Sequence, residues 1–208
     1  MTMFSARSQK EQTITLLKEN GLMRGVELND AGIHPETLAR MVNDQTVTRV
    51  ARGLYQLVDA EISTWHDLAE IAKRVPKGVI CLVTALQFHE LTLQMPSYVW
   101  LAIDSKARRP KIDYPPARIV RFGAQFLYLG VQTYNIDAVS VSISNPAKAV
   151  VDCFRFRQQI GIDIALEGLY TAVKSGKAKP AQIVQYSRYA RIWSVIRPYL
   201  ETVVAIGT

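Results

Sequence analysis

The sequence predicts an α+β fold, because its strand patterns and its helix patterns form separate groups instead of alternating along the chain. Alternating apolar residues predict strands between residues 98 and 143, whereas the patterns after residue 145 have helical spacing. With 208 residues, 49% hydrophobic and 21% charged, the chain can build a proper core. We expect a small domain at residues 1–60 and a larger mixed domain at residues 61–208, with a small antiparallel sheet and a C-terminal helical cluster.

The first helix is predicted from its two ends. Ser8 and Glu11 have the spacing of a capping box, in which each side chain binds the other residue's backbone N–H. The helix runs to Asn20, and Gly21 ends it as glycines commonly do. A short helix at residues 26–31 follows.

The next elements predict a reader of duplex DNA. Gly32 occupies a turn that needs a residue tolerant of positive φ, and Pro35 suits the first position of a second helix. The apolar side of this helix consists of Leu38, Met41 and Val42. Strands at residues 46–50 and 54–58 then form a hairpin. Helix, turn, helix and hairpin in this order indicate a winged helix-turn-helix domain, which docks on duplex DNA.

The larger domain is expected to begin with helices, continue with strands and end with helices. We expect helices after residue 63 or 64 up to 75 and at 81–91, strands at 98–103, 118–122, 126–129 and 139–143, and helices at 146–159, 163–174, 180–189 and 192–204. Asn145 caps the first of the later helices, with Pro146 at its first position.

The net charge of +7 favours a polyanionic partner, but it is unevenly distributed. Residues 1–60 carry seven basic and seven acidic side chains, so the whole surplus lies in residues 61–208. The predicted DNA reader is therefore neutral, and its binding should depend on specific contacts more than on general attraction to phosphates.

Seven polar residues of the second helix and the hairpin are the candidates for DNA contacts. They are His34, Glu36, Thr37, Arg40, Asn43, Arg49 and Arg52. Arg40 has the reach for a guanine edge, and the two hairpin arginines suit the backbone or the minor groove. The alternative is that these are solvated residues of a domain used only for protein contacts.

A basic loop in the larger domain is the second candidate surface. Possible contacts with phosphate or with a partner protein are Lys106, Arg108, Arg109, Lys111, Arg118, Lys148 and Arg155. Charged loops also keep sheet edges from aggregating, so the sequence leaves a purely structural role equally open.

Catalysis has little support in the sequence. Asp104 and Lys106 have the D-x-K spacing of a metal-dependent nuclease, but such a site needs another acid, for which Glu90 is the only nearby candidate. Asp152 lies in the apolar run AVVDCF and is expected to pair with Arg155 or Arg157. We expect no catalytic residue, no metal site and no cofactor.

The two thiols, Cys81 and Cys153, stand beside apolar residues, which suits buried cysteines in a reducing compartment. The segment MTMFSARSQKE lacks the apolar run of a signal peptide, and no apolar run is long enough to cross a membrane. We therefore expect a cytoplasmic protein that does not bind membranes.

Several segments resemble one protein family. AGIHPETLARMV followed by VTRVARGLYQL looks like the N-terminal domain of AbiEi-type antitoxins, which belong to type IV toxin–antitoxin systems of abortive phage infection. VICLVTALQFHEL, VWLAI with the basic loop after it, SNPAKAVVDCFRFR, GIDIALEGLYTAV and IRPYLE are similar to the second domain. The resemblance extends over roughly residues 8–200.

The resemblance implies a repressor of its own operon that binds inverted repeats in promoter DNA, with Thr37, Arg40, Arg49 and Arg52 at the DNA. It also implies a C-terminal domain that counteracts a nucleotidyltransferase-like toxin, without requiring a stable complex. Where the family often has Arg-Thr, this chain has Lys148-Ala149, and a lysine at a partner contact keeps the charge but loses the bidentate fork.

Two other hypotheses remain at this point. The chain is a stand-alone transcriptional regulator whose second domain binds a ligand or mediates assembly, or it is a nuclease that uses Asp104 and Lys106. The sequence specifies neither the operator nor the oligomeric state.

Overall fold

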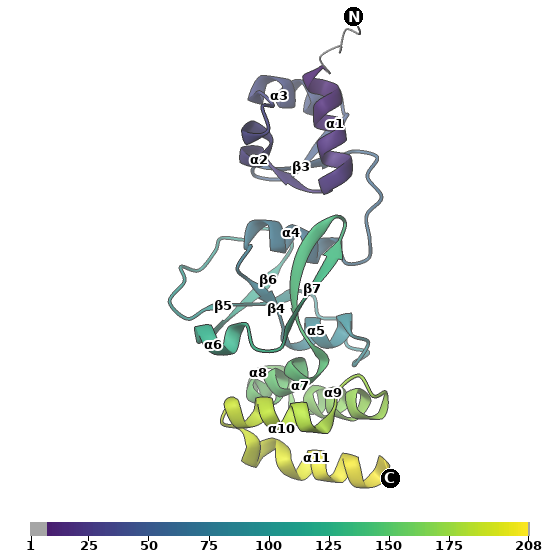
Figure 1. Cartoon of the computed structure of the whole chain (residues 1–208), viewed down its shortest axis with the longest axis vertical. Coiled ribbons are helices and arrows are strands. Elements are labelled where there is room, and N and C mark those ends of the chain that lie inside the picture. The colour runs from purple at the N-terminus through teal and green to yellow at the C-terminus, as the bar shows by residue number, and fades with distance from the viewer. Residues whose placement is uncertain (1–7, 208) are drawn as a thin grey trace, which may run out of the picture. The chain divides into compact units, whose positions relative to one another are not determined.

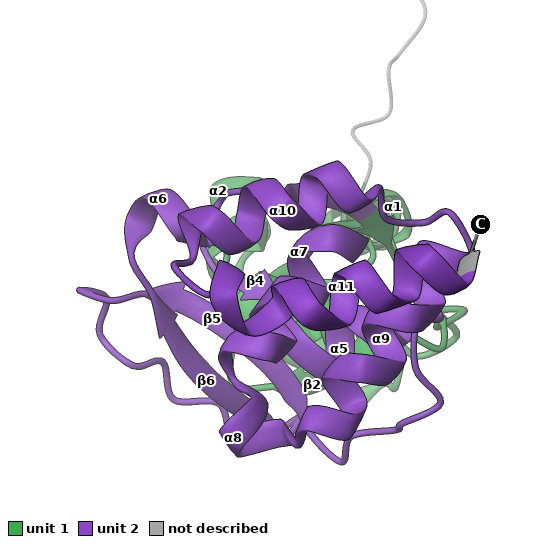
Figure 2. Ribbon diagram, turned by 90° about the horizontal axis from the view of Figure 1, so that it is seen from below, with its two compact units in different colours: residues 1–76, 135–140 green, residues 77–134, 141–208 purple. Residues whose placement is uncertain are grey.

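The computed structural model describes residues 8–207. Residues 1–7, the first part of the segment examined for a signal peptide, lie outside the described residues. The chain forms two compact units, residues 1–76 with 135–140 and residues 77–134 with 141–208 (Figure 2). Helices and strands are mixed as the sequence predicts, and the fold is α+β. That residues 1–60 and 61–208 are separate domains stays a prediction.

The first unit combines four helices with a small sheet (Figure 1). Its elements are α1 (Gln9–Asn20), β1 (Met23–Arg24), α2 (Gly25–Asp30), α3 (Pro35–Asn43), β2 (Val47–Ala51), β3 (Leu54–Leu57) and α4 (His66–Arg74). The sheet is antiparallel in the order β1-β3-β2. Its apolar core is formed by Leu17, Met23, Leu28, Ile33, Leu38, Met41, Val47 and Leu57.

The local signals at the ends of α1 act as the sequence predicts. The Ser8 hydroxyl accepts the N–H of Glu11 at 3.2 Å, and the Glu11 carboxylate accepts the N–H of Ser8 at 3.1 Å. Gly21 ends the helix with a φ of 60°, and Gly32 has a φ of 88° in the turn before α3. These glycines adopt a backbone conformation that side chains with a Cβ disfavour.

The second unit is built on a five-stranded sheet in the order β6-β5-β4-β8-β7. Its elements are β4 (Val79–Ile80), α5 (Leu82–Phe88), β5 (Val99–Asp104), β6 (Ala117–Phe122), α6 (Ala124–Leu127), β7 (Val131–Ile136), β8 (Val139–Ser144), α7 (Pro146–Arg155), α8 (Arg157–Ile160), α9 (Ile162–Lys174), α10 (Pro180–Tyr189) and α11 (Trp193–Gly207). The turn between β7 and β8 belongs to the first unit.

Two predictions about this sheet are wrong. The sheet is mixed and not antiparallel, because β5 pairs with β6, and β4 with β8, in parallel. The long connection 105–116 allows β6 to return in the same direction as β5. The strand expected at residues 126–129 is instead the end of α6, since a short buried apolar run fits a helix as well as a strand.

Helix α7 lies at the centre of the second unit. Every residue from Ala147 to Phe154 is buried, and α7 packs against α5, α9 and α10. The Asn145 side chain caps it by accepting the N–H of Lys148 at 2.9 Å. The helices that follow α7 form the predicted C-terminal cluster (Figures 1 and 2).

None of the helices in residues 8–207 is both long enough and apolar enough to cross a membrane.

Candidate nucleic-acid interface

Helix α3 has one face in the core and one face in solvent. His34 lies at its N-cap and Pro35 at its first position, so the chain enters the helix without losing a backbone hydrogen bond. Leu38 and Met41 are buried, and α3 packs against α1. This packing fixes which side chains the helix can present to a partner.

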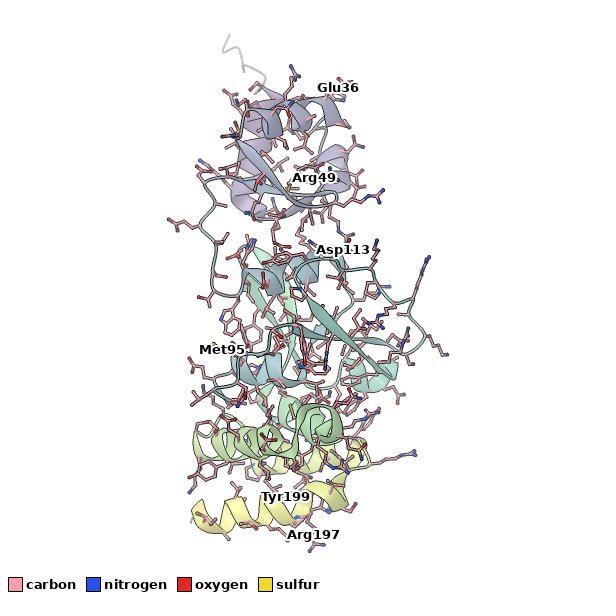
Figure 3. The ribbon with its side chains drawn as sticks, turned by 180° about the vertical axis from the view of Figure 1, so that it is seen from behind. Glu36, Arg49, Met95, Asp113, Arg197 and Tyr199 are labelled. Atoms are coloured by element: carbon pink, nitrogen blue, oxygen red, sulfur yellow. The ribbon has the colours of Figure 1, made fainter. Side chains whose placement is uncertain are left out.

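Four of the five predicted contacts on or next to α3 lie in solvent. His34, Glu36, Arg40 and Asn43 are exposed, and Figure 3 marks Glu36. Thr37 is only 9% exposed, and its hydroxyl donates a hydrogen bond of 2.8 Å to the side-chain carbonyl of Gln9 in α1. The structure thus ties Thr37 to α1, and the exposed Arg40, one turn further along, donates to the Thr37 hydroxyl at 3.4 Å.

The hairpin of β2 and β3 presents the two other predicted arginines. Arg49, marked in Figure 3, and Arg52 are both exposed. The register shifts between Arg49 and Ala51, and Gly53 makes the turn with a φ of 71°. Arg49 Nε donates to the carbonyl of Ala51 at 3.3 Å. A bulge of this kind twists the hairpin and sets the direction of the arginines.

Two acidic residues of the first unit, Asp44 and Glu27, are engaged locally. Lys10 Nζ lies 2.8 Å from Asp44, and this hydrogen bond, helped by Thr46, lowers the pKa of Asp44 to about 2. Glu27 accepts the N–H of Arg24 at 2.7 Å and pairs with Lys73. Because cationic or N–H groups partly compensate the charge of these carboxylates, they repel a nearby phosphate less than unpaired carboxylates would.

A shallow hollow of about 470 Å³ lies between α1 and α3. Gln9, Lys10, Thr37, Arg40 and Asp44 are among its lining residues. It is adjacent to the exposed face of α3, so a partner bound to that face has polar groups of α1 within reach.

The basic loop of the second unit is exposed, as a solvated or partner-binding loop must be. Lys106, Arg108, Arg109 and Lys111 all lie in solvent. Arg121 fixes the start of the loop by donating to the carbonyls of Ser105 at 2.7 Å and Ala107 at 2.8 Å. The loop therefore leaves the sheet in a defined direction.

Arg118 is exposed but held against aromatic rings. Its guanidinium carbon lies 4.3 Å from the ring centre of Tyr98 and 5.6 Å from that of Trp100. These cation–π contacts hold the guanidinium against the sheet next to the basic loop.

Lys148 corrects an expectation drawn from the sequence. Its side chain is 0% exposed, so it is not available to a partner or a phosphate. Its ammonium lies 2.6 Å from each carboxylate oxygen of Asp152 and 3.8 Å from the ring centre of Phe126. Burial raises the pKa of Asp152, and the ammonium opposes that shift. The expected partners of Asp152, Arg155 and Arg157, are therefore replaced by Lys148, four residues earlier.

Arg155 differs from Lys148 in being exposed at the end of α7. Its guanidinium carbon lies 4.9 Å from the ring centre of Phe126 and 5.5 Å from that of Phe122. The rings of Phe122 and Phe126 therefore contact two cations, the buried ammonium of Lys148 and the exposed guanidinium of Arg155.

The residues considered for catalysis have structural partners. Asp104 accepts the N–H of Lys106 at 2.8 Å, which is an ordinary turn at a strand end. Glu90 pairs with Lys177 at 2.8 Å. Within residues 8–207, no three His, Cys, Asp or Glu side chains are grouped so that they could hold a metal ion.

Both cysteines are buried, as expected. Burial raises the pKa of the Cys81 and Cys153 thiols well above the usual range, and the charge of Asp152 adds to this. Thiols in this state are poor nucleophiles.

Sequence reasoning missed two kinds of residue. Gln9, which binds Thr37, lies on another helix, and no local pattern connects the two. Tyr189 and Arg191, at the end of α10, line a hollow together with Arg155. Arg191 has a positive φ at a helix end where glycine is usual, as do Gln45 after α3 and Glu90 after α5, so the backbone does not single it out.

Comparison with known proteins connects the first unit to a family. Residues 11–58 match the family of AbiEi antitoxins, described as transcriptional regulators, and this match confirms the resemblance to AbiEi-type antitoxins. The matched segment runs from α1 to just past β3. No curated protein matches the sequence.

A solved structure shares the fold. The crystal structure of the RV2827C protein from Mycobacterium tuberculosis superposes with a TM-score of 0.64 over 96% of this chain and 78% of that chain. The two sequences are 12% identical, so the likeness concerns the fold alone.

Proposed function

We propose that the chain is an antitoxin and the repressor of its own operon, because residues 11–58 match the family of AbiEi antitoxins, described as transcriptional regulators. In this proposal α2, α3 and the β2–β3 hairpin form a winged helix-turn-helix. Helix α3 enters the major groove of promoter DNA at inverted repeats, and the hairpin contacts the backbone or the minor groove.

The observation that carries the proposal is the coincidence of the family match with the exposed polar surface. The matched residues include α3 and the hairpin, which expose Arg40, Asn43, Arg49 and Arg52. Thr37 takes a different part, since its buried hydroxyl binds Gln9. We assign Thr37 to holding α3 on α1, and Arg40 to the DNA.

The second half of the proposal concerns residues 61–208. They counteract a nucleotidyltransferase-like toxin, in the manner of type IV systems, without a stable complex between the two proteins. The resemblance of SNPAKAVVDCFRFR and the neighbouring segments to the family's second domain supports this role. No catalytic reaction is assigned to the chain.

A band-shift titration tests the first half. The purified chain should shift a fragment of its own promoter and not a fragment whose inverted repeats are scrambled. The triple variant Arg40→Ala, Arg49→Ala, Arg52→Ala should lose the shift. Arg197→Ala is a matched control, because Arg197 is an exposed arginine on α11 (Figure 3). Equal affinity for both fragments would contradict the proposal.

Co-expression with the neighbouring gene product tests the second half. The chain should restore growth that the neighbouring protein arrests. The triple variant, which keeps the full chain, should restore growth as well, since the two roles use different residues. If the folded triple variant fails to restore growth, the separation of roles is wrong. If the chain itself fails, the protein is better described as a stand-alone regulator.

A further inference from the structure

A hollow on the second unit has the composition of a site for anions. Its volume is about 540 Å³, within the range of small-molecule sites. Three cationic residues line it: Lys106 from the loop after β5, Arg155 from the end of α7 and Arg191 from the turn after α10. Elements distant in the sequence thus bring three positive charges to one place.

These charges have no ion-pair partner in the described part of the chain, and the carboxylate on which Arg155 acts electrostatically, Asp152, is buried and already paired with Lys148. No Asp or Glu is among the residues that line the hollow, and none of the three cations forms an ion pair. Like charges gathered without counter-charge repel one another. An anionic group placed among them would remove this repulsion.

An aromatic wall stands beside the cations. Phe126 and Tyr189 both line the hollow, and their rings are parallel within 9° at a centroid distance of 5.9 Å. The Tyr189 hydroxyl donates to the side-chain carbonyl of Gln125 at 2.8 Å, which fixes the ring. Tyr189 is nevertheless 48% exposed. An exposed, fixed aromatic ring is a stacking surface that any nucleobase can use.

Arg191 occupies a backbone position that normally favours glycine. Its φ is 57°, its N–H donates to the carbonyl of Arg188 at 3.0 Å, and the N–H of Ile192 donates to that of Ser187 at 2.9 Å. This is the left-handed end of a helix, where a residue with a Cβ is disfavoured. Gln45 and Glu90 occupy the same conformation after α3 and α5, and at each of these positions a glycine would relieve the strain.

We propose that this hollow binds a nucleoside polyphosphate. The phosphates lie among Lys106, Arg155 and Arg191, and the base stacks on Tyr189. Arginine side chains bind phosphate oxygens through paired N–H groups, and the lysine adds a point charge. The inference does not depend on the proposed repressor role, because none of these residues lies in α3 or the hairpin.

Isothermal titration of the full chain at low salt tests the proposal. The probes are ATP, GTP, CTP and UTP, with pyrophosphate as the phosphate-only ligand and adenosine as the base-only ligand. At least one nucleoside triphosphate should bind at micromolar to millimolar concentrations. Pyrophosphate and adenosine should each bind more weakly, because each lacks half of the contacts.

Arg191→Gly is the most informative variant. It removes the guanidinium and places the favoured residue at the left-handed position, so the melting temperature should stay the same or rise. Binding should nevertheless weaken about tenfold or more, as expected for the loss of a charged contact. Lys106→Ala, in an exposed loop, should weaken binding as well. The matched control is Arg188→Ala, an exposed arginine of α10 that does not line the hollow.

Three results would overturn the proposal. The first is that none of the triphosphates binds at millimolar concentrations. The second is that Arg191→Gly and Lys106→Ala bind as tightly as Arg188→Ala. The third is that a short single-stranded oligonucleotide binds and the mononucleotides do not, because the surface would then belong to a nucleic-acid groove.

Discussion

Two lysine–aspartate pairs, one in each unit, have similar geometry in opposite environments. Lys10 and Asp44 are 2.8 Å apart, with side chains 52% and 44% exposed. Lys148 and Asp152 are 2.6 Å apart, and both side chains are 0% exposed. The contact distance is therefore a poor guide to what a pair does. Burial decides whether the charges serve the fold or remain available to a partner.

The same difference separates the two candidate surfaces. On α3 and the hairpin, the candidate polar residues other than Thr37 are exposed above an apolar core, as a DNA-binding surface requires. On α7, Lys148 is sealed under Phe122 and Phe126, whereas Arg155 lies exposed near the same rings. About two turns of helix, together with two aromatic side chains, lie between a structural charge and a charge that can bind a ligand.

The largest expected effect is the loss of the buried pair. Lys148→Met should lower the free energy of unfolding by about 3–5 kcal/mol, because it leaves the Asp152 carboxylate buried without its partner. Urea denaturation measures this change. Lys10→Met is the matched control in the exposed pair and should alter stability little.

The double variant Lys148→Met, Asp152→Leu tests the reason for that loss. If the cost comes from an unpaired buried charge, removing both charges should recover much of the stability, since apolar side chains of similar volume fit a buried site well. If the double variant is as unstable as Lys148→Met, packing and not charge explains the effect.

The second expected effect is on DNA affinity. Arg40→Ala should weaken operator binding by about 1–3 kcal/mol if Arg40 contacts a guanine, since a bidentate contact is lost. Band-shift titration measures it, with Arg197→Ala as the control. Unchanged affinity would remove Arg40 from the interface. A loss that is equal on operator and scrambled DNA would assign Arg40 to the phosphates instead.

The elements that the sequence predicts well are those with local signals. Ser8 and Glu11 cap α1, Pro35 begins α3, and Asn145 caps α7, as expected from residues a few positions apart. α6 was missed because its short apolar run has no such signal. The parallel pairing of β5 with β6 was missed because pairing depends on contacts far apart in the chain.

The candidate sites also consist of residues that a local pattern predicts and residues that depend on contacts distant in the sequence. Arg40 and Arg52 were predicted as exposed from the spacing of their own helix and hairpin. The spacing of Lys148 and Asp152, one helical turn apart, was visible in the sequence, but their burial under rings from other elements was not. The hollow beside Arg191 brings together three distant segments, and no local pattern can reveal that.

The third expected effect concerns the buried hydroxyl of Thr37. Thr37→Val removes its hydrogen bond to Gln9 and should lower the free energy of unfolding by about 0.5–1.5 kcal/mol. Thr15→Val is the control, because the Thr15 hydroxyl bonds only to a carbonyl of its own exposed helix face. If Thr37→Val leaves stability intact but weakens operator binding as much as Arg40→Ala, Thr37 acts at the DNA, either by its own contact or by orienting Arg40, which donates to its hydroxyl at 3.4 Å.

The smallest expected effect is the acid titration of the exposed pair. The folded pKa of Asp44 is lowered from 3.8 to about 2, chiefly by the hydrogen bond from Lys10. The pair therefore contributes stability above the unfolded pKa, and that contribution is lost as the pH falls from about 3.8 through about 2. Carboxyl NMR titration should show the low pKa in the native chain and a higher pKa, closer to 3.8, in Lys10→Met, where the hydrogen bonds from Thr46 remain. Because both side chains are exposed, added salt should bring the native pKa toward the same value. If the pKa of Asp44 stays low in Lys10→Met, the hydrogen bonds from Thr46, and not the one from Lys10, are its main cause.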